Sequence, residues 1–256
     1  GSLRAKNVRF AANTHGRRTI QSVISLLLWL NGLMVFSIPG SIYLVITIVI
    51  PPRYVHFLLI QVCRLILGAS GQFLRIEGRF PSLKEGPYIY IFNHASLFDV
   101  LIMIAVVPEY ACAVGKSQQF DWPFWGSIIR RYGAIPIRRE KLQPAIQSLN
   151  LAEDSIHSKR SLIISPEGTR TLDGKLLSFK KGAFHVAKNT GATIIPIGIN
   201  GAFEAKPKSG WHVKPGIITV RIGEPIPRVS FENISVDQLR DLARNEVEQL
   251  LREVKK

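Results

Sequence analysis

The feature that most constrains this sequence is a long run without a charged side chain, from Thr19 to Pro52. Its first part, Thr19–Ile38, has the length of about 20 apolar residues that crosses the hydrocarbon core of a bilayer. Pro39-Gly40 interrupts the apolar pattern, and Ser41–Ile50 resumes it. The run therefore predicts helices that associate with a membrane.

Four arrangements of this run deserve comparison. A removed signal peptide fits poorly, because the run is too long and no small-residue cleavage site closes it. A single crossing would place the rest of the chain on the far side of the membrane. A buried hairpin of a soluble protein fits poorly with so long an uncharged run. Basic residues flank both ends, so the positive-inside tendency favours a helical hairpin over residues 19–74 that turns at Pro39-Gly40.

This hairpin places the rest of the chain on the cytoplasmic face of the cell membrane, whether it spans the bilayer or lies in one leaflet. From Arg53 the pattern predicts a further helix with its polar residues on one side. Those polar residues are Arg53, His56, Gln61 and Arg64.

The charge balance indicates anionic partners. The chain has 33 Lys and Arg against 18 Asp and Glu, a formal charge of +15, and no acidic residue precedes Glu77. Apolar runs edged by Arg and Lys favour an anionic phospholipid surface. No zinc finger, RNA-binding signature or basic heptad region is present, which argues against nucleic acid. Cys63 and Cys112 are the only cysteines, which excludes a disulfide framework or a thiolate metal cluster.

The sequence divides into three parts. Residues 1–18 form a basic N-terminal segment, in which Gly1-Ser2 resembles the remnant of an expression tag, and residues 19–74 form the hairpin. Residues 75–256 alternate short apolar strands with helices, which predicts an α/β fold, a mixed β-sheet flanked by helices on both faces. The predicted strands are Tyr88–Phe92, Ala111–Val114, Ala134–Ile137, Leu162–Ser165, Thr193–Ile199 and Ile217–Ile222. The predicted helices are Val100–Val107, Pro144–His157, Gly182–Asn189 and Val236–Val254.

A histidine and an aspartate follow the first of these strands. His94 and Asp99 are five residues apart, so they meet only if His94 lies on the loop and Asp99 in the first helical turn. Ser96 and Asp99 form an S-x-x-D pattern, which predicts a helix start at Ser96. A carboxylate beside an imidazole fixes its tautomer and makes the other nitrogen a general base. The alternative is that Asp99 only caps the helix and His94 only packs.

Three further polar clusters lie near strand ends. Gly133–Arg139 ends in two arginines, which suit bidentate phosphate binding, although a solvated basic edge is the alternative. In Ser165–Arg170, Gly168 permits a close backbone approach to a ligand, although Glu167 and Arg170 could simply pair. In Ile195–Gly201, a proline inside a strand indicates an edge or a kink. Phosphate-loop, dinucleotide, nucleophile-elbow and zinc-protease motifs are missing.

In this order, the four clusters resemble the glycerolipid acyltransferase family, most closely the lysophosphatidate acyltransferases. The family pattern is N-H-x4-D, then G-x-x-F-I-x-R, then F-P-E-G-T-R, then an apolar-Pro-apolar strand. The likeness covers roughly Ile76 to Gly223, and the E-G-T-R segment is unaltered. Pro136 and Ser165 stand where the pattern has Phe, which bears on packing more than on chemistry.

The resemblance implies acyl transfer from a thioester of coenzyme A or acyl carrier protein to the sn-2 hydroxyl of lysophosphatidate. It implies that His94 is the general base and Asp99 its orienting carboxylate. It associates five residues with the acceptor and its phosphate, and Lys116 stands where relatives often carry a lysine. Those five are Arg139, Glu167, Gly168, Thr169 and Arg170. No cofactor or metal is expected, since the other histidines lack ligand spacing.

Two alternatives remain open at this point. Glycerol 3-phosphate or another lysophospholipid could be the acceptor in the same chemistry. A more distant alternative is a non-catalytic membrane protein that binds anionic lipid through its basic face.

Overall fold

The computed structural model describes residues 2–137 and 142–252. Within these residues the strands form one seven-stranded sheet in the order β1-β7-β6-β2-β5-β3-β4. All neighbouring pairs are parallel except β6 and β7. The strands are β1 Gln72–Glu77, β2 Tyr88–Phe92, β3 Cys112–Lys116, β4 Ile135–Ile137, β5 Leu162–Ile164, β6 Thr193–Asn200 and β7 Gly216–Ile222.

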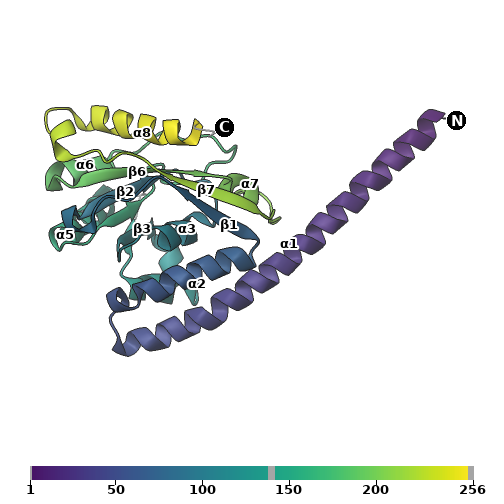
Figure 1. The fold of residues 1–256 in the computed structure, drawn as a ribbon, viewed down its shortest axis with the longest axis horizontal. Helices are drawn as coiled ribbons and strands as arrows, with labels where there is room; N and C mark the ends of the chain where they lie inside the picture. Colours follow the sequence, from purple (N-terminus) through teal and green to yellow (C-terminus); the bar gives the residue numbers. More distant parts are fainter. Residues whose placement is uncertain (1, 138–141, 253–256) are drawn as a thin grey trace.

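Helices cover both faces of the sheet, as Figure 1 shows, so the predicted fold class is confirmed. α5, α6 and α8 pack on one face, while α2, α3 and α4 pack on the other, with α1 beneath α2. The helices are α1 Ser2–Val49, α2 His56–Ala69, α3 Asp99–Val106, α4 Trp125–Tyr132, α5 Leu142–His157, α6 Gly182–Thr190, α7 Ala202–Ala205 and α8 Val236–Arg252. Short 3-10 turns occupy Pro52–Tyr54, Leu83–Glu85, Ser117–Asp121 and Arg228–Ser230.

The central strand β2 shows why buried strands could be predicted from the sequence. Tyr88 and Tyr90 enter the core beneath α2 and α3, whereas Ile89 and Ile91 enter the core beneath α5 and α6. A strand that is buried on both faces is apolar at every position and does not alternate. The other predicted strands also lie within two residues of the observed bounds at either end, including Ile217–Ile222, which was predicted from its alternation.

Among the described residues, β1, α4 and the single-turn helix α7 were not predicted. β1 pairs in parallel with β7 at the edge of the sheet, and it begins at Gln72, before the predicted domain boundary at residue 75. Its sequence mixes polar residues with an exposed Phe73, so it lacks the signal of a buried strand. α4 packs against α1 through aromatic side chains, with the rings of Phe36 and Phe124 5.3 Å apart.

The predicted turn at Pro39-Gly40 is wrong, because α1 continues through both residues. Pro39 removes one helical N–H, a loss that apolar helices accommodate when neighbouring groups satisfy the freed carbonyl. Gly40 serves close packing, because a Cβ there would lie 2.8 Å from the ring of Phe124. The chain reverses instead at Pro51-Pro52, where two consecutive prolines force Ile50 and Pro51 out of the helical conformation.

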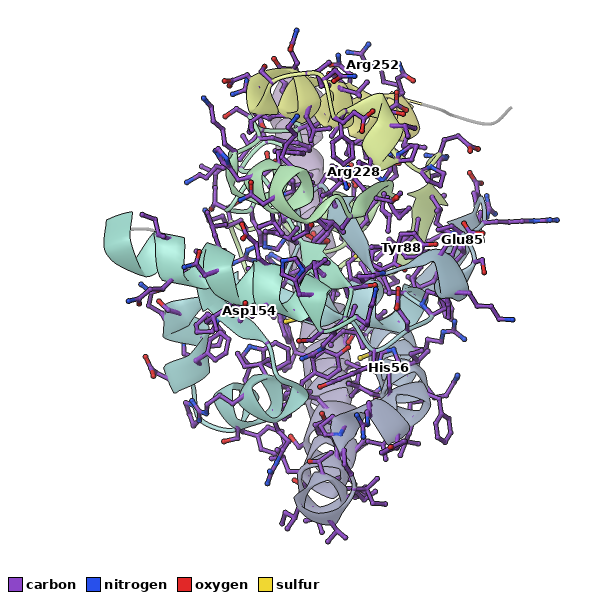
Figure 2. All side chains as sticks on the ribbon, turned by 90° about the vertical axis from the view of Figure 1, so that its left-hand side faces the viewer. His56, Glu85, Tyr88, Asp154, Arg228 and Arg252 are labelled. Atoms are coloured by element: carbon purple, nitrogen blue, oxygen red, sulfur yellow. The ribbon has the colours of Figure 1, made fainter. Side chains whose placement is uncertain are left out.

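The hairpin of α1 and α2 presents an apolar surface. One helical segment, Thr19–Val49, is long and apolar enough to cross a membrane. On α2, Phe57 and Leu65 are more than half exposed, whereas His56 is only 6% exposed (labelled in Figure 2). The predicted division of α2 into a polar and an apolar side therefore does not hold, since His56 packs inward against Tyr110.

Candidate active site

The candidate site lies where parallel strands end. β2 runs into His94, β5 into the segment that contains Glu167, and β3 ends at Lys116. Because β2, β5, β3 and β4 are parallel neighbours, their carboxyl ends share one edge of the sheet. β4 ends at Ile137, and the predicted phosphate ligand Arg139 lies outside the described residues.

The structure brings His94 and Asp99 together, with His94 Nδ1 2.7 Å from Asp99 Oδ2. The same oxygen accepts hydrogen bonds from the backbone N–H groups of Ala95 at 2.7 Å and Ser96 at 2.8 Å. Asp99 is fully buried, while the side chain of His94 is 24% exposed. Since a carboxylate only accepts, Nδ1 carries a proton, and in the neutral imidazole Nε2 then has its lone pair free for a ligand.

The helix that carries Asp99 begins later than predicted. α3 starts at Asp99, three residues after Ser96. The reach of the Asp99 carboxylate back to the Ser96 N–H nevertheless reproduces half of a capping box. Since α3 has Phe98 at its N-cap and no side-chain cap, Asp99 does not cap the helix; with one oxygen it fixes the loop before α3 and orients His94.

Glu167 holds the backbone on which His94 stands. Its Oε1 accepts a hydrogen bond from the His94 N–H at 2.6 Å, and its Oε2 accepts one from the Leu177 N–H at 2.8 Å. The Thr171 N–H donates to the His94 carbonyl at 3.0 Å, so the peptide groups on both sides of His94 are fixed. Burial raises the pKa of Glu167, opposed by these two backbone hydrogen bonds. In the described part of the chain, Glu167 forms no ion pair with Arg170.

The other predicted residues are more accessible. Gly168 has a φ of +76°, which favours glycine, and it directs the chain from buried Glu167 to exposed Thr169. Arg170 is partly exposed beside Thr169, and Lys116 is exposed at the end of β3. Arg170 follows β5 and Lys116 ends β3, and the carboxyl ends of these two strands lie at the same edge of the sheet as His94.

Two positioning residues were missed. Buried Asn93 donates from its amide to the Ile199 carbonyl at 2.9 Å and accepts from the Ile199 N–H at 2.7 Å, which ties the end of β2 to β6. The Ser96 hydroxyl donates to the Lys206 carbonyl at 2.9 Å. The sequence carried two signals for Asn93, since it directly follows a buried strand and is the first residue of the N-H-x4-D pattern.

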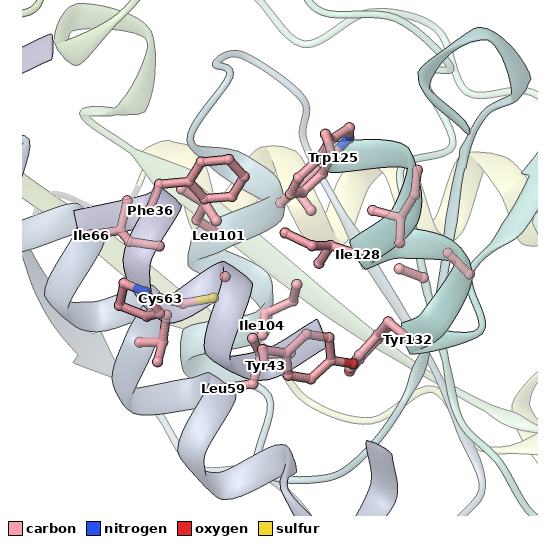
Figure 3. Close-up of a pocket in the computed structure, with 17 residues that line it drawn as sticks. Phe36, Tyr43, Leu59, Cys63, Ile66, Leu101, Ile104, Trp125, Ile128 and Tyr132 are labelled. Carbon is pink, nitrogen blue, oxygen red and sulfur yellow. The ribbon is translucent and has the colours of Figure 1, made fainter. Parts of the chain in front are cut away.

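An apolar cavity lies beside these residues. Its volume is about 290 Å³, and Leu97 and Phe98, which stand between His94 and Asp99 in the chain, form part of its wall. An enclosed cavity of about 50 Å³ adjoins it and shares Phe36, Leu101 and Trp125 with it (Figure 3). The site therefore joins a polar edge to an apolar interior that α1, α2, α3 and α4 enclose.

Known proteins resemble this chain in sequence. A family model described as Acyltransferase matches residues 74–200. The chain is 32% identical to 1-acyl-sn-glycerol-3-phosphate acyltransferase of Cocos nucifera, over 68% of this chain and 56% of that protein. It is 32% identical to the protein of the same name from Saccharomyces cerevisiae, over 75% of this chain and 62% of that protein. The matches thus span about three fifths of these relatives.

A crystal structure of the 1-acyl-sn-glycerophosphate acyltransferase from Thermotoga maritima has a similar fold. The TM-score is 0.77 at 24% identity, and the match covers 94% of this chain and 100% of that chain. The long N-terminal helix and the sheet are therefore features of a known fold. Together with the match over residues 74–200, the sequence likeness to these relatives shows that the chain belongs to the acyltransferase family.

Proposed function

We propose that the chain transfers an acyl group from an acyl thioester to the sn-2 hydroxyl of lysophosphatidate, which yields phosphatidate and a free thiol. The observation that carries this proposal is the geometry of His94, whose Nδ1 is bonded to buried Asp99 while Nε2 is available. The relatives named for this activity support the choice of acceptor.

The chemistry follows from that geometry. His94 Nε2 takes the proton of the acceptor hydroxyl as its oxygen attacks the thioester carbonyl. Asp99 holds the imidazole and stabilises its positive charge. The tetrahedral intermediate collapses, the C–S bond breaks, and the leaving thiolate takes the proton from the imidazolium. Because the acceptor hydroxyl attacks directly, the proposed reaction has no acyl-enzyme intermediate and uses no metal or bound cofactor.

The polar and apolar parts of the site suit the two ends of the substrates. The acceptor phosphate requires cations, and we assign Arg170, Arg139 and Lys116 to it. The apolar cavity beside Leu97 and Phe98 suits an acyl chain. The basic chain also suits an acidic thioester donor, either coenzyme A or acyl carrier protein.

The contacts of α1 support a hairpin that lies in one leaflet. The α/β domain contacts α1 at Trp29, whose Nε1 donates to the Trp211 carbonyl at 2.7 Å, and again at Gly40 beside Phe124. A helix that crossed the bilayer would draw this polar backbone into hydrocarbon, where water cannot satisfy it. We therefore infer that α1 and α2 embed their exposed apolar face in the cytoplasmic leaflet, so that the acceptor reaches His94 from the membrane.

The test is thiol release from an acyl thioester by the detergent-purified full chain. The reaction is run with lysophosphatidate, with glycerol 3-phosphate and without an acceptor. We expect release only with lysophosphatidate, and no burst of thiol without an acceptor. A preference for glycerol 3-phosphate would contradict the assigned acceptor. Release without any acceptor would contradict direct attack by the hydroxyl.

A further inference from the structure

The loop of residues 206–215, between α7 and β7, lies against the candidate active site. The Lys206 carbonyl accepts the Ser96 hydroxyl at 2.9 Å. Farther along, Lys208 Nζ donates to Thr169 Oγ1 at 3.1 Å and contacts the Arg170 carbonyl at 3.5 Å. The loop therefore touches both segments that hold His94, although neither the motif pattern nor the comparisons assign it a role.

The structure of the loop fixes where Lys208 stands. Lys206 is 7% exposed, and its Nζ donates to the carbonyls of Pro207 and Gly210, both at 2.8 Å. On the side of α1, the hydroxyl of fully buried Ser25 accepts the Val213 N–H at 3.1 Å. With these bonds at both ends, the loop presents Lys208 in a defined position.

Three cationic side chains, those of Arg170, Lys206 and Lys208, gather at this point. In the described part of the chain, Arg170, Lys206 and Lys208 form no ion pair with a carboxylate. Burial lowers the pKa of Lys206, and the nearby Arg170 lowers it further. Like charges that are held together with no carboxylate partner indicate an anion that binds between them.

Lys208 is better placed than Lys206 to meet that anion. The ammonium group of Lys206 is buried on two carbonyls, whereas Lys208 is exposed. An ammonium group has three N–H donors, and the two contacts of Lys208 leave one for a ligand. In lysophosphatidate the phosphate is attached to the carbon next to the one that carries the reacting hydroxyl. The groups that bind this phosphate must therefore lie beside His94, where the Thr171 N–H already holds the His94 carbonyl.

We propose that Lys208 binds the phosphate of the acceptor together with Arg170, and that the loop of residues 206–215 is a positioning element for it. This inference rests on the proposed function, since it names the phosphate of that acceptor as the ligand.

The first test measures binding without turnover. The full chain in detergent is titrated with lysophosphatidate and with the monoacylglycerol that lacks its phosphate, by calorimetry. Lys208→Ala should raise the Kd for lysophosphatidate roughly tenfold to a hundredfold, as expected for a lost charge-assisted hydrogen bond, and leave the Kd for monoacylglycerol unchanged. Lys214→Ala is the matched control, because it removes the same charge from an exposed position of the same loop.

The proposal is overturned if Lys208→Ala binds lysophosphatidate as the wild type does, or if Lys214→Ala weakens binding equally. The second test separates the proposal from the proposed function. Lys208→Ala should raise the KM for lysophosphatidate and keep kcat within a few-fold. Lys208-dependent binding by a wild type that transfers no acyl group would refute the proposed function and leave the phosphate site standing. Acyl transfer by Lys208→Ala with the KM of the wild type would refute the role of Lys208 and leave the proposed function standing.

Discussion

Replacement of Asp99 by Asn isolates the charge that supports His94. The side chains are nearly the same shape, and the Asn oxygen can keep the bonds from the Ala95 and Ser96 N–H groups. What is lost is a negative charge in contact with the imidazole, Nδ1 to Oδ2 being 2.7 Å. For charge centres about 4 Å apart and an effective dielectric constant of about 20, the lost attraction is about 4 kcal/mol. That loss corresponds to roughly a thousandfold decrease in kcat.

The assay is steady-state thiol release, with kcat and KM determined separately. The KM for the acceptor should change little, because Asp99 is buried behind His94 and is not among the groups that bind the acceptor. In the described residues Asp99 Oδ1 has no hydrogen-bond partner, so the Asn amide would be buried unpaired at a cost of about 1–3 kcal/mol. Rates must therefore be compared below the melting temperature of the variant. Asp121→Asn removes one negative charge at an exposed position and is the control for the change in net charge. A kcat within tenfold of the wild type would refute the reasoning.

Three further predictions concern stability, measured as the free energy of unfolding or as Tm in detergent. Glu167→Gln leaves one of two partly buried N–H groups, those of His94 and Leu177, without an acceptor, which should cost about 1–3 kcal/mol. An unchanged Tm would contradict these hydrogen bonds. Burial raises the pKa of Glu167 above its ordinary value of 4.5, so just above pH 4.5 the folded protein still holds a proton that the unfolded chain has lost. The free energy of unfolding should therefore fall as the pH rises from 4.5 through the raised pKa of the folded protein. The wild type should show this fall, and Glu167→Gln should not. Gly201→Ala should destabilise the fold by more than about 1 kcal/mol, because φ is +90° and a Cβ would lie 2.6 Å from the Ile217 carbonyl oxygen. Gly68→Ala has open space around the new Cβ and should stabilise α2 by up to about 1 kcal/mol. Equal changes in stability for the two variants would contradict the packing described around Gly201.

The sequence supports prediction where the signal is local. β2 is apolar at every position and polar residues follow it directly, so both the strand and the site after it could be predicted. His94 and Asp99 are five residues apart, and a loop-to-helix junction is the one local geometry that joins them. The prediction of a turn at Pro39-Gly40 was wrong because a proline followed by a glycine usually marks a turn. Here Gly40 lies inside α1, and the ring of Phe124, far along the chain, packs against it.

What could not be predicted depends on contacts between distant segments. The bond from the His94 N–H to Glu167 joins residues 73 positions apart, and nothing near Glu167 distinguishes it from pairing with Arg170. Lys208 reaches Thr169 across 39 positions from a loop whose own sequence carries no motif. Such groups become visible only once the parallel strands bring their carboxyl ends to one edge.

The central claim is that His94 is the general base for acyl transfer. The most direct measurement is the rate of lysophosphatidate-dependent thiol release by His94→Ala, beside the wild type and His185→Ala, whose imidazole is exposed on α6. With both variants folded, His94→Ala should lose about 10²–10⁴-fold or more in kcat, while His185→Ala keeps the wild-type rate. A His94→Ala protein that releases thiol within tenfold of the wild-type rate would contradict the account.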